Sequence, residues 1–285
     1  MTDFRPSRFE VLPTVVKNLL IINGLMFLAM VTLAKMGIDL NDMLALHYWK
    51  SELFRPWQLV THLFMHGSID PQHIDISGGI MHLFSNMFAL WMFGSILENV
   101  WGTKRFLTFY LVCGIGAALI HMGVLSYENH QLETVVKAYL ANPTIDQFSL
   151  FLKQHVEVSS SPGLYQFQDA WAMDPNNSAY SMQSMRFVNQ YLRLVENTAT
   201  VGASGAVFGI LFAFGYLFPN TLLYIYFAFP VKAKYFVAVY ALFELFAGVR
   251  NSAGDNVAHF AHLGGMLVAY ILLRIWNKRQ RSSFF

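Results

Sequence analysis

Residues 201–218 read VGASGAVFGILFAFGYLF, an apolar stretch with one hydroxyl group near its start, that of Ser204. A membrane-spanning helix needs about 20 mainly apolar residues, or somewhat fewer when neighbouring helices shield it. A polar group at membrane depth costs on the order of a few kcal/mol when it has no partner. The hydroxyl group is therefore expected to have a partner and a functional reason for its position.

The composition of the whole chain also indicates a membrane protein. Of its 285 residues, 55% are hydrophobic and 13% are charged, and the mean hydropathy is +0.41. These values differ strongly from those of an ordinary soluble domain. The net charge of +2 gives no indication of a nucleic-acid partner, and Cys113, as the single cysteine, cannot form an internal disulfide. We expect an all-α, polytopic protein embedded in the lipid bilayer.

Six segments have the length and the apolar character of spanning helices. The fourth and the fifth are short, and the aromatic link between them, PNTLLYIYFAFPVKAK, is typical of a segment at the membrane interface rather than of a seventh span. The six predicted helices are Val15 to Ala34, Ile80 to Val100, Phe106 to Leu125, Gly202 to Phe218, Tyr235 to Val249 and Val257 to Trp276.

The basic residues predict how the chain is oriented. When the N-terminus is placed inside, 11 of the 19 lysines and arginines fall in the short inner segments, as the positive-inside rule favours. Both termini are then cytoplasmic. The inner basic residues are Arg5, Arg8, Lys17, Lys104, Arg105, Lys232, Lys234, Arg274, Lys278, Arg279 and Arg281.

Two long segments then lie outside. One covers residues 35–79, and the other covers residues 126–200. The second contains the helix-like stretches TIDQFSLFLKQHVE, with Thr144 as its expected cap, and SAYSMQSMRFVNQYLRLVEN. We therefore expect a small helical insert on the outer face.

Three polar clusters lie at the outer ends of the predicted helices. Ser204 is in GASG, His259 and His262 are in HFAHLGG of the sixth helix, and His82 and Asn86 are in MHLFSN of the second. Polar side chains within the membrane are rare and usually have a function. Because the three clusters share a depth, they are candidates for one site.

Small residues on two helices favour close packing. Gly205 and Gly209 form a stripe on the fourth helix, and Gly265 and Ala269 form a matching stripe on the sixth. His262 lies three residues before the second stripe and on its face. Packing of the two stripes would bring this histidine toward the serine, so the pattern fits both simple helix packing and a serine–histidine pair.

A serine nucleophile needs a base within hydrogen-bond reach and donors aimed at the developing oxyanion. Ser204 begins a helix, so its backbone N–H has no partner within that helix. His82 and Asn86 present two side-chain donors from one face. Since no acidic residue lies within a turn of His262, we expect a dyad, with Phe208 holding the imidazole plane by stacking.

GASG, AHLGG in the last helix, HLFSN in the second helix and the order of six helices resemble the rhomboid family of intramembrane serine proteases. The resemblance implies Ser204 as the nucleophile, His262 as the general base, His82 and Asn86 as oxyanion partners, and Phe208 as the ring that packs on the histidine. It implies one membrane domain over residues 1–285 that needs no cofactor or metal and cleaves transmembrane substrates near the outer face. We expect it in a bacterial cell membrane.

The segment FRPWQLVTHLFMH resembles the first outer loop of that family, although a proline separates Arg55 from Trp57. His62 and His66 in this segment are expected to be structural rather than catalytic. Glu98, near the inner end of the second helix, matches a recurrent acidic position of the family and is expected to form structural hydrogen bonds.

Two other classes of function are compatible with the sequence. A non-catalytic member of the same family would bind transmembrane helices without cleaving them, but such proteins lose the serine or the histidine, and this chain retains both. A metal site or a transporter could use His62, His82, His259 and His262, since imidazole binds zinc. Neither an HExxH motif nor a carboxylate near these histidines is apparent in the sequence, and chelator sensitivity would distinguish this site from the dyad.

Overall fold

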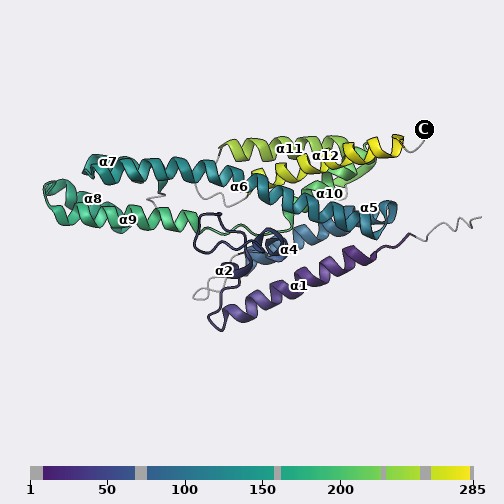
Figure 1. Cartoon of the computed structure of the whole chain (residues 1–285), viewed down its shortest axis with the longest axis horizontal. Coiled ribbons are helices and arrows are strands. Elements are labelled where there is room, and N and C mark those ends of the chain that lie inside the picture. Colours follow the sequence, from purple (N-terminus) through teal and green to yellow (C-terminus); the bar gives the residue numbers. More distant parts are fainter. Residues whose placement is uncertain (1–8, 68–75, 157–161, 226–228, 251–257, 283–285) are drawn as a thin grey trace, which may run out of the picture.

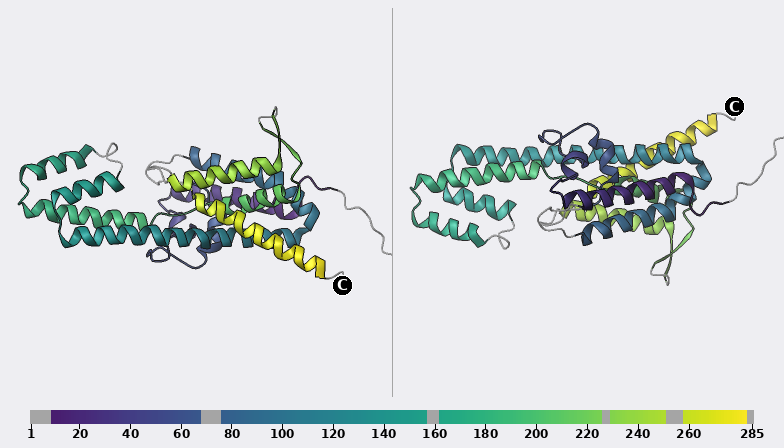
Figure 2. Two further views of the ribbon diagram at one scale, coloured as in Figure 1. Left: turned by 90° about the horizontal axis from the view of Figure 1, so that it is seen from above. Right: turned by 90° about the horizontal axis from the view of Figure 1, so that it is seen from below.

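The computed structural model of the chain describes residues 9–67, 76–156, 162–225, 229–250 and 258–282. In this part of the chain, the protein is elongated and its long helices run side by side (Figure 1). Views from above and below show a bundle of long helices and a smaller group of helices that projects from one end of it (Figure 2). The predicted helical architecture is confirmed, with one short strand pair added to it.

All six predicted helices are present. The first is α1, and the second is a helical run of α4, a π-helical turn called η2, and α5. The third to sixth are α6, α10, α11 and α12, although the predicted start of the last one, Val257, lies outside the described residues. Their bounds are α1 Thr14–Ala34, α4 Ser77–Ala89, η2 Leu90–Gly94, α5 Ser95–Trp101, α6 Thr103–Ala141, α10 Ser204–Leu217, α11 Ala233–Arg250 and α12 His259–Ser282.

Within the described residues, four helical runs are long and apolar enough to cross a membrane: Thr14–Ala34, Ser77–Trp101, Thr103–Ala141 and His259–Asn277. α10 is apolar but has only 14 residues. Most of its side chains are buried against neighbouring helices, which is why so short a helix can lie at membrane depth. α11 has 18 residues and contains the buried Glu244.

Glycine contacts hold α10 between two other helices. A Cβ added at Gly205 would lie 2.6 Å from the Cβ of Ala117 on α6, and one added at Gly209 would lie 2.9 Å from the Cβ of Cys113. On the other side, a Cβ added at Gly265 of α12 would lie 1.9 Å from the carbonyl oxygen of Gly205. The predicted packing of small-residue stripes is therefore confirmed, and it brings α10 and α12 to backbone contact.

Glu98 on α5 fixes the start of α1. The backbone N–H groups of Val15 and Val16 donate to its two carboxylate oxygens, each at 2.9 Å. These N–H groups lie in the first turn of α1 and have no acceptor within the helix. The predicted structural hydrogen bonds of Glu98 are thus confirmed.

Hydrogen bonds within the described part of the segment between α1 and α4 fix its course. Arg55 donates from Nη1 to the carbonyl oxygens of Glu52 and Phe54, and the indole N–H of Trp57 donates to the carbonyl oxygen of Met43. The arginine and the tryptophan therefore fix different parts of the loop. The short helices of this segment are α2 Asn41–Leu44, α3 Gln58–Thr61 and η1 His62–Phe64.

The insert between the third and fourth predicted helices differs from the prediction at its start. α6 was expected to end at Leu125, but it continues without a break to Ala141 and supplies the first helix of the insert. Both predicted stretches are helical, and the hydroxyl of Thr144 accepts the N–H of Gln147 as a cap. A further helix, α8, lies between them. The bounds are α7 Ile145–His155, α8 Pro162–Met173 and α9 Ser178–Glu196.

The insert has a hydrophobic core of its own, separate from the core around α10. It lies at the opposite end of the molecule from the beginning of α1 and the end of α12 (Figure 1). The core residues of the insert are Leu132, Val136, Tyr139, Phe148, Phe151, Leu152, Trp171 and Val188.

The aromatic link between α10 and α11 forms a β-hairpin rather than a further helix. β1 (Leu222–Ile225) pairs antiparallel with β2 (Phe229–Lys232), with Tyr224 opposite Pro230. Tyr224 and Phe229 are exposed. The prediction that this link is not a seventh span is confirmed.

Candidate active site

The hydroxyl group of Ser204 has the partner that its position requires. Ser204 is the first residue of α10, and its Oγ lies 2.8 Å from Nε2 of His262 on α12. His262 is buried, whereas Ser204 is only partly covered. The contact depends on the backbone approach of the two helices at Gly205 and Gly265, each of which is close in sequence to one of the two polar residues.

An aromatic ring fixes the plane of the imidazole. The ring of Phe208, one turn beyond Ser204, lies parallel to that of His262, with 4.1 Å between the centroids and 5° between the planes. Tyr240 of α11 also packs on Phe208, with the ring centroids 4.9 Å apart and 50° between the planes. The predicted stacking contact is therefore present, and it limits rotation of the histidine about χ2.

A carboxylate that the sequence did not indicate completes the polar cluster. Nδ1 of His262 lies 2.8 Å from Oε2 of Glu244, and Nδ1 of His259 lies 2.7 Å from the same oxygen. The prediction that His262 has no acidic partner is wrong, because Glu244 lies within hydrogen-bond distance of its ring. Glu244 is 18 residues away in the chain and on another helix, α11, so a search within one turn of His262 could not find it.

The same contact places a carboxylate beside two of the four histidines that were considered as metal ligands. Ligand atoms of Glu244, His259 and His262 lie within 4.8 Å of one another. His62 and His82 are not part of this group. The two nitrogen–oxygen distances are those of N–H···O hydrogen bonds, which the two histidines make to one carboxylate.

His82 lies beside the serine, as predicted. Gly202 has φ +120°, and a Cβ added there would lie 2.9 Å from Nε2 of His82 and 3.6 Å from Oγ of Ser204. The imidazole of His82 thus covers Gly202 next to the hydroxyl. Asn86, one turn further along α4, is buried, and its amide donates to the carbonyl oxygen of His82 at 3.0 Å.

His62 and His66 take up structural positions. Nδ1 of His62 lies 2.7 Å from the carbonyl oxygen of Gln58, and the ring of His66 packs on that of His82 with 5.0 Å between the centroids. Burial lowers the pKa of His62 to about 4. Burial, together with the neighbouring His82, lowers the pKa of His66 to about 3. Both residues are therefore neutral at physiological pH and support the wall of the site.

The segment that leads into Ser204 is held from two sides. The backbones of Leu46 and Thr200 exchange two hydrogen bonds, at 2.9 and 2.8 Å. The hydroxyl of Thr200 also bonds to Nε2 of His121 on α6, at 3.0 Å. The N–H of Gly202 donates to the carbonyl oxygen of His62. These contacts fix the direction from which the chain enters α10.

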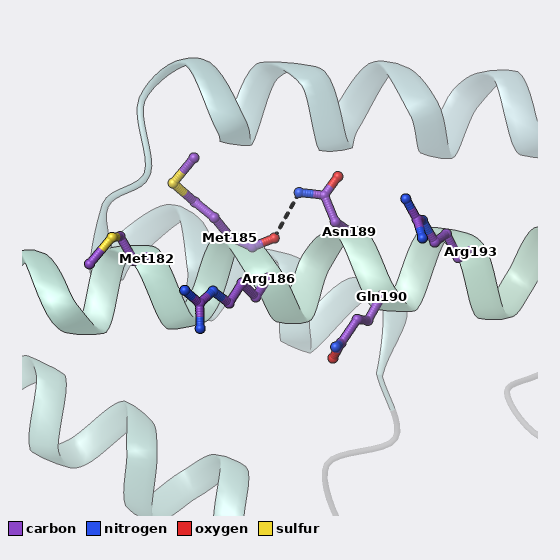
Figure 3. Close-up of a pocket in the computed structure, with 6 residues that line it drawn as sticks. All are labelled: Met182, Met185, Arg186, Asn189, Gln190 and Arg193. Atoms are coloured by element: carbon purple, nitrogen blue, oxygen red, sulfur yellow. Dashed lines mark hydrogen bonds between the residues drawn. The ribbon is translucent and has the colours of Figure 1, made fainter.

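A separate shallow pocket lies on the insert and has no residue in common with this cluster. Its lining comes from one face of α9, where the amide of Asn189 donates to the carbonyl oxygen of Met185 (Figure 3). It holds two arginines but no candidate nucleophile or base, so the candidate active site is the cluster around Ser204. The lining residues are Met182, Met185, Arg186, Asn189, Gln190 and Arg193.

Comparison with known proteins gives one consistent family. The model of the Rhomboid domain matches residues 53–138 and 180–279, more than half of the chain. The chain is 27% identical over 233 residues to an uncharacterized mitochondrial rhomboid protein of Schizosaccharomyces pombe, covering 79% of this chain and 53% of that protein. It is 25% identical over 244 residues to the mitochondrial RHOMBOID-like protein 12 of Arabidopsis thaliana, covering 86% and 52%.

A third relative is named as a protease. Over 88 residues, 31% of this chain and 14% of the relative, the chain is 32% identical to the rhomboid protease GluP of Bacillus subtilis. The chain spans about half the length of the two mitochondrial relatives.

Proposed function

Because the chain belongs to the rhomboid family, we propose that it is an intramembrane serine endopeptidase that cleaves transmembrane proteins near the outer face of the membrane. One observation supports this function above the others: the hydroxyl of Ser204 lies at hydrogen-bond distance from Nε2 of His262, whose ring is stacked on Phe208. A nucleophile next to a base whose orientation is fixed is the arrangement that acyl transfer requires.

In the proposed reaction, Oγ of Ser204 attacks the carbonyl carbon of the scissile peptide bond, and its proton passes to Nε2 of His262. The tetrahedral intermediate collapses, the carbon–nitrogen bond breaks, and the amine leaves with the proton from His262. Water, deprotonated by the same imidazole, then hydrolyses the acyl-enzyme and releases Ser204. The partial exposure of Ser204 fits this need for water.

The alternative is a family member that binds transmembrane helices without cleaving them. The retained serine–histidine contact favours the enzyme. The two functions are distinguished by reconstituting the purified protein in liposomes together with a reporter. The reporter carries one transmembrane segment and a tag at each end, so that its fragments can be detected separately. The proposed function requires two tagged fragments from the wild-type protein. Intact reporter that co-purifies with the protein would support the binder instead.

Asn86 tests the proposed oxyanion site. We propose that its amide and His82 donate to the negative oxygen that forms when Ser204 attacks. Asn86→Ala is expected to lower turnover about 100- to 1,000-fold, because such a hydrogen bond strengthens as the charge develops. If Asn86 serves only helix packing, its loss costs roughly 1 kcal/mol of stability, and turnover falls no more than the folded fraction does. Turnover and thermal stability in detergent, measured on the same samples, separate the two results.

The orientation of the chain is also a proposal. The beginning of α1 and the end of α12 lie at the end of the molecule away from α7, α8 and α9 (Figure 1). This arrangement fits both termini on one side of the membrane and the insert on the other. Because the basic residues gather in the short segments on the side of the termini, we propose that the termini are cytoplasmic, that residues 126–200 lie outside, and that the membrane is a bacterial cell membrane. A cysteine in place of Asn176 should then react with an impermeant thiol reagent in intact cells. Protection there, together with labelling of a cysteine near Arg281, would reverse the orientation.

A further inference from the structure

Glu244 is the one acidic group in contact with the proposed catalytic pair among the described residues. We propose that Glu244 is a positioning residue that turns the Ser204–His262 pair into a triad, and that His259 holds it in place. This inference rests on the proposed function. The hydroxyl of Ser204 bonds to Nε2 of His262 and Glu244 bonds to Nδ1 of the same ring, so Glu244 acts through His262.

The contact determines which nitrogen of His262 carries the proton. An ionised carboxylate only accepts hydrogen bonds, so an N–H at Nδ1 of His262 must donate to Oε2 of Glu244. Nε2 is then left with a lone pair, 2.8 Å from Oγ of Ser204. This is the tautomer that can accept the serine proton, and the negative carboxylate stabilises the imidazolium that results.

His259 makes the position of the carboxylate independent of His262. Its Nδ1 donates to the same oxygen at 2.7 Å, and the two histidines lie three residues apart on one face of α12. The side chain of Glu244 is only 4% exposed, so its charge is removed from water and needs both donors. When the proton moves between Ser204 and His262 during catalysis, the hydrogen bond from His259 keeps the carboxylate of Glu244 in the same position.

The shape of α11 shows why the glutamate reaches this place. Tyr240, Glu244 and Gly248 lie at successive four-residue intervals and thus on one face of the helix. Tyr240 packs on Phe208, and a Cβ added at Gly248 would lie 3.1 Å from the Cβ of His259. The absent side chain at Gly248 lets α11 approach α12 next to the cluster. The carboxylate of Glu244 on α11 therefore reaches the two histidines on α12, so that α10, α11 and α12 all contribute to the site.

The test is Glu244→Gln, which keeps the size of the side chain and removes its charge. In soluble serine triads, the corresponding change lowers turnover by about 10⁴-fold through the wrong tautomer. Here the stacked Phe208 still holds the ring plane, so we expect a fall in kcat of about 10- to 1,000-fold with KM changed by less than about threefold. The rate of fluorophosphonate labelling of Ser204, which needs no protein substrate, should fall in parallel.

Glu98→Gln is the matched control, because Glu98 is also a buried glutamate that accepts two hydrogen bonds, but at the start of α1. It should lower thermal stability and leave kcat per folded molecule unchanged. Glu244→Asp retains the charge one methylene short and should be more active than Glu244→Gln. This variant also tests the proposal if the glutamine variant folds poorly.

Four results would overturn the positioning role. The first is a wild-type kcat in Glu244→Gln, and the second is a loss of activity in that variant that is explained fully by a smaller folded fraction. The third is a Glu244→Asp variant that is no more active than Glu244→Gln. The fourth is activity of the wild-type protein that a chelator abolishes and Zn²⁺ restores. The last would assign Glu244, His259 and His262 to a metal instead. An inactive wild-type protein would contradict the proposed function itself, and so the two failures are distinguishable.

Discussion

Replacing Ser204 by alanine is expected to reduce cleavage of a transmembrane reporter by about 10⁶-fold, that is, to the background rate. The substitution removes a single oxygen and leaves the packing of α10 intact, because the neighbouring Gly205 and Gly209 make the backbone contacts. No other hydroxyl is bonded to a histidine that is itself bonded to a carboxylate among the described residues. The loss should therefore be one of chemistry, with thermal stability unchanged.

The control for this prediction is Ser95→Ala, since Ser95 is a buried serine on α5. Cleavage and covalent labelling by a fluorophosphonate should both be retained in the control and lost in Ser204→Ala. Mass spectrometry of the labelled wild-type protein should find the adduct on Ser204. Labelling that persists without Ser204 would show that another residue is the nucleophile.

Gly265→Ala is expected to remove activity by separating α10 from α12. The added methyl group would lie 1.9 Å from the carbonyl oxygen and 2.8 Å from the carbonyl carbon of Gly205, and backbone atoms cannot turn away as a side chain can. Overpacking typically costs about 1–3 kcal/mol, and this contact lies at the upper end. A shift of about 1 Å between Ser204 and His262 would in addition lower turnover about 100-fold.

Gly123→Ala provides the comparison. Gly123 lies on α6, and a Cβ added there would have no atom within 4 Å. The turnover of Gly123→Ala should equal that of the wild-type protein, and its melting temperature in detergent should be no lower, because alanine favours a helix more than glycine does. Both quantities should fall in Gly265→Ala. A Gly265→Ala protein that is fully stable and active would show that the two helices do not need backbone contact.

The sequence alone predicted those features of the site that depend on local spacing. The helix that starts at Ser204, the small-residue stripes and the ring of Phe208 are all encoded within a few residues of one another, so helical periodicity placed them correctly. The two stripes of small residues were compatible with a pair of Ser204 and His262 and with simple helix packing alike, and the resemblance of GASG and AHLGG to the rhomboid motifs favoured the pair. Their separation of 58 residues posed no difficulty, because each motif could be recognised by itself.

The contact of Glu244 with His262 could not be predicted from the local sequence. The residues next to Glu244 in the sequence, ALF before it and LFAG after it, are apolar, and nothing in them indicates a contact with a histidine on α12. The contact depends on how α11 crosses α12 at Gly248, and that crossing follows from tertiary packing rather than from a periodic pattern. The sequence also did not predict the hairpin in the aromatic link or the continuation of α6 beyond Leu125. Local composition determines neither feature.

The unbroken course of α6 has a mechanical consequence. At 1.5 Å per residue, its 39 residues measure about 58 Å, roughly twice the thickness of the hydrocarbon layer. One half carries Cys113 and Ala117, which touch α10, and the other half carries Val136 and Tyr139, which belong to the core of the insert. To tilt the insert against the bundle, backbone hydrogen bonds in the middle of α6 would have to break. The helix is thus a rigid spacer, and a protein bound to the insert would be held at a fixed distance from Ser204.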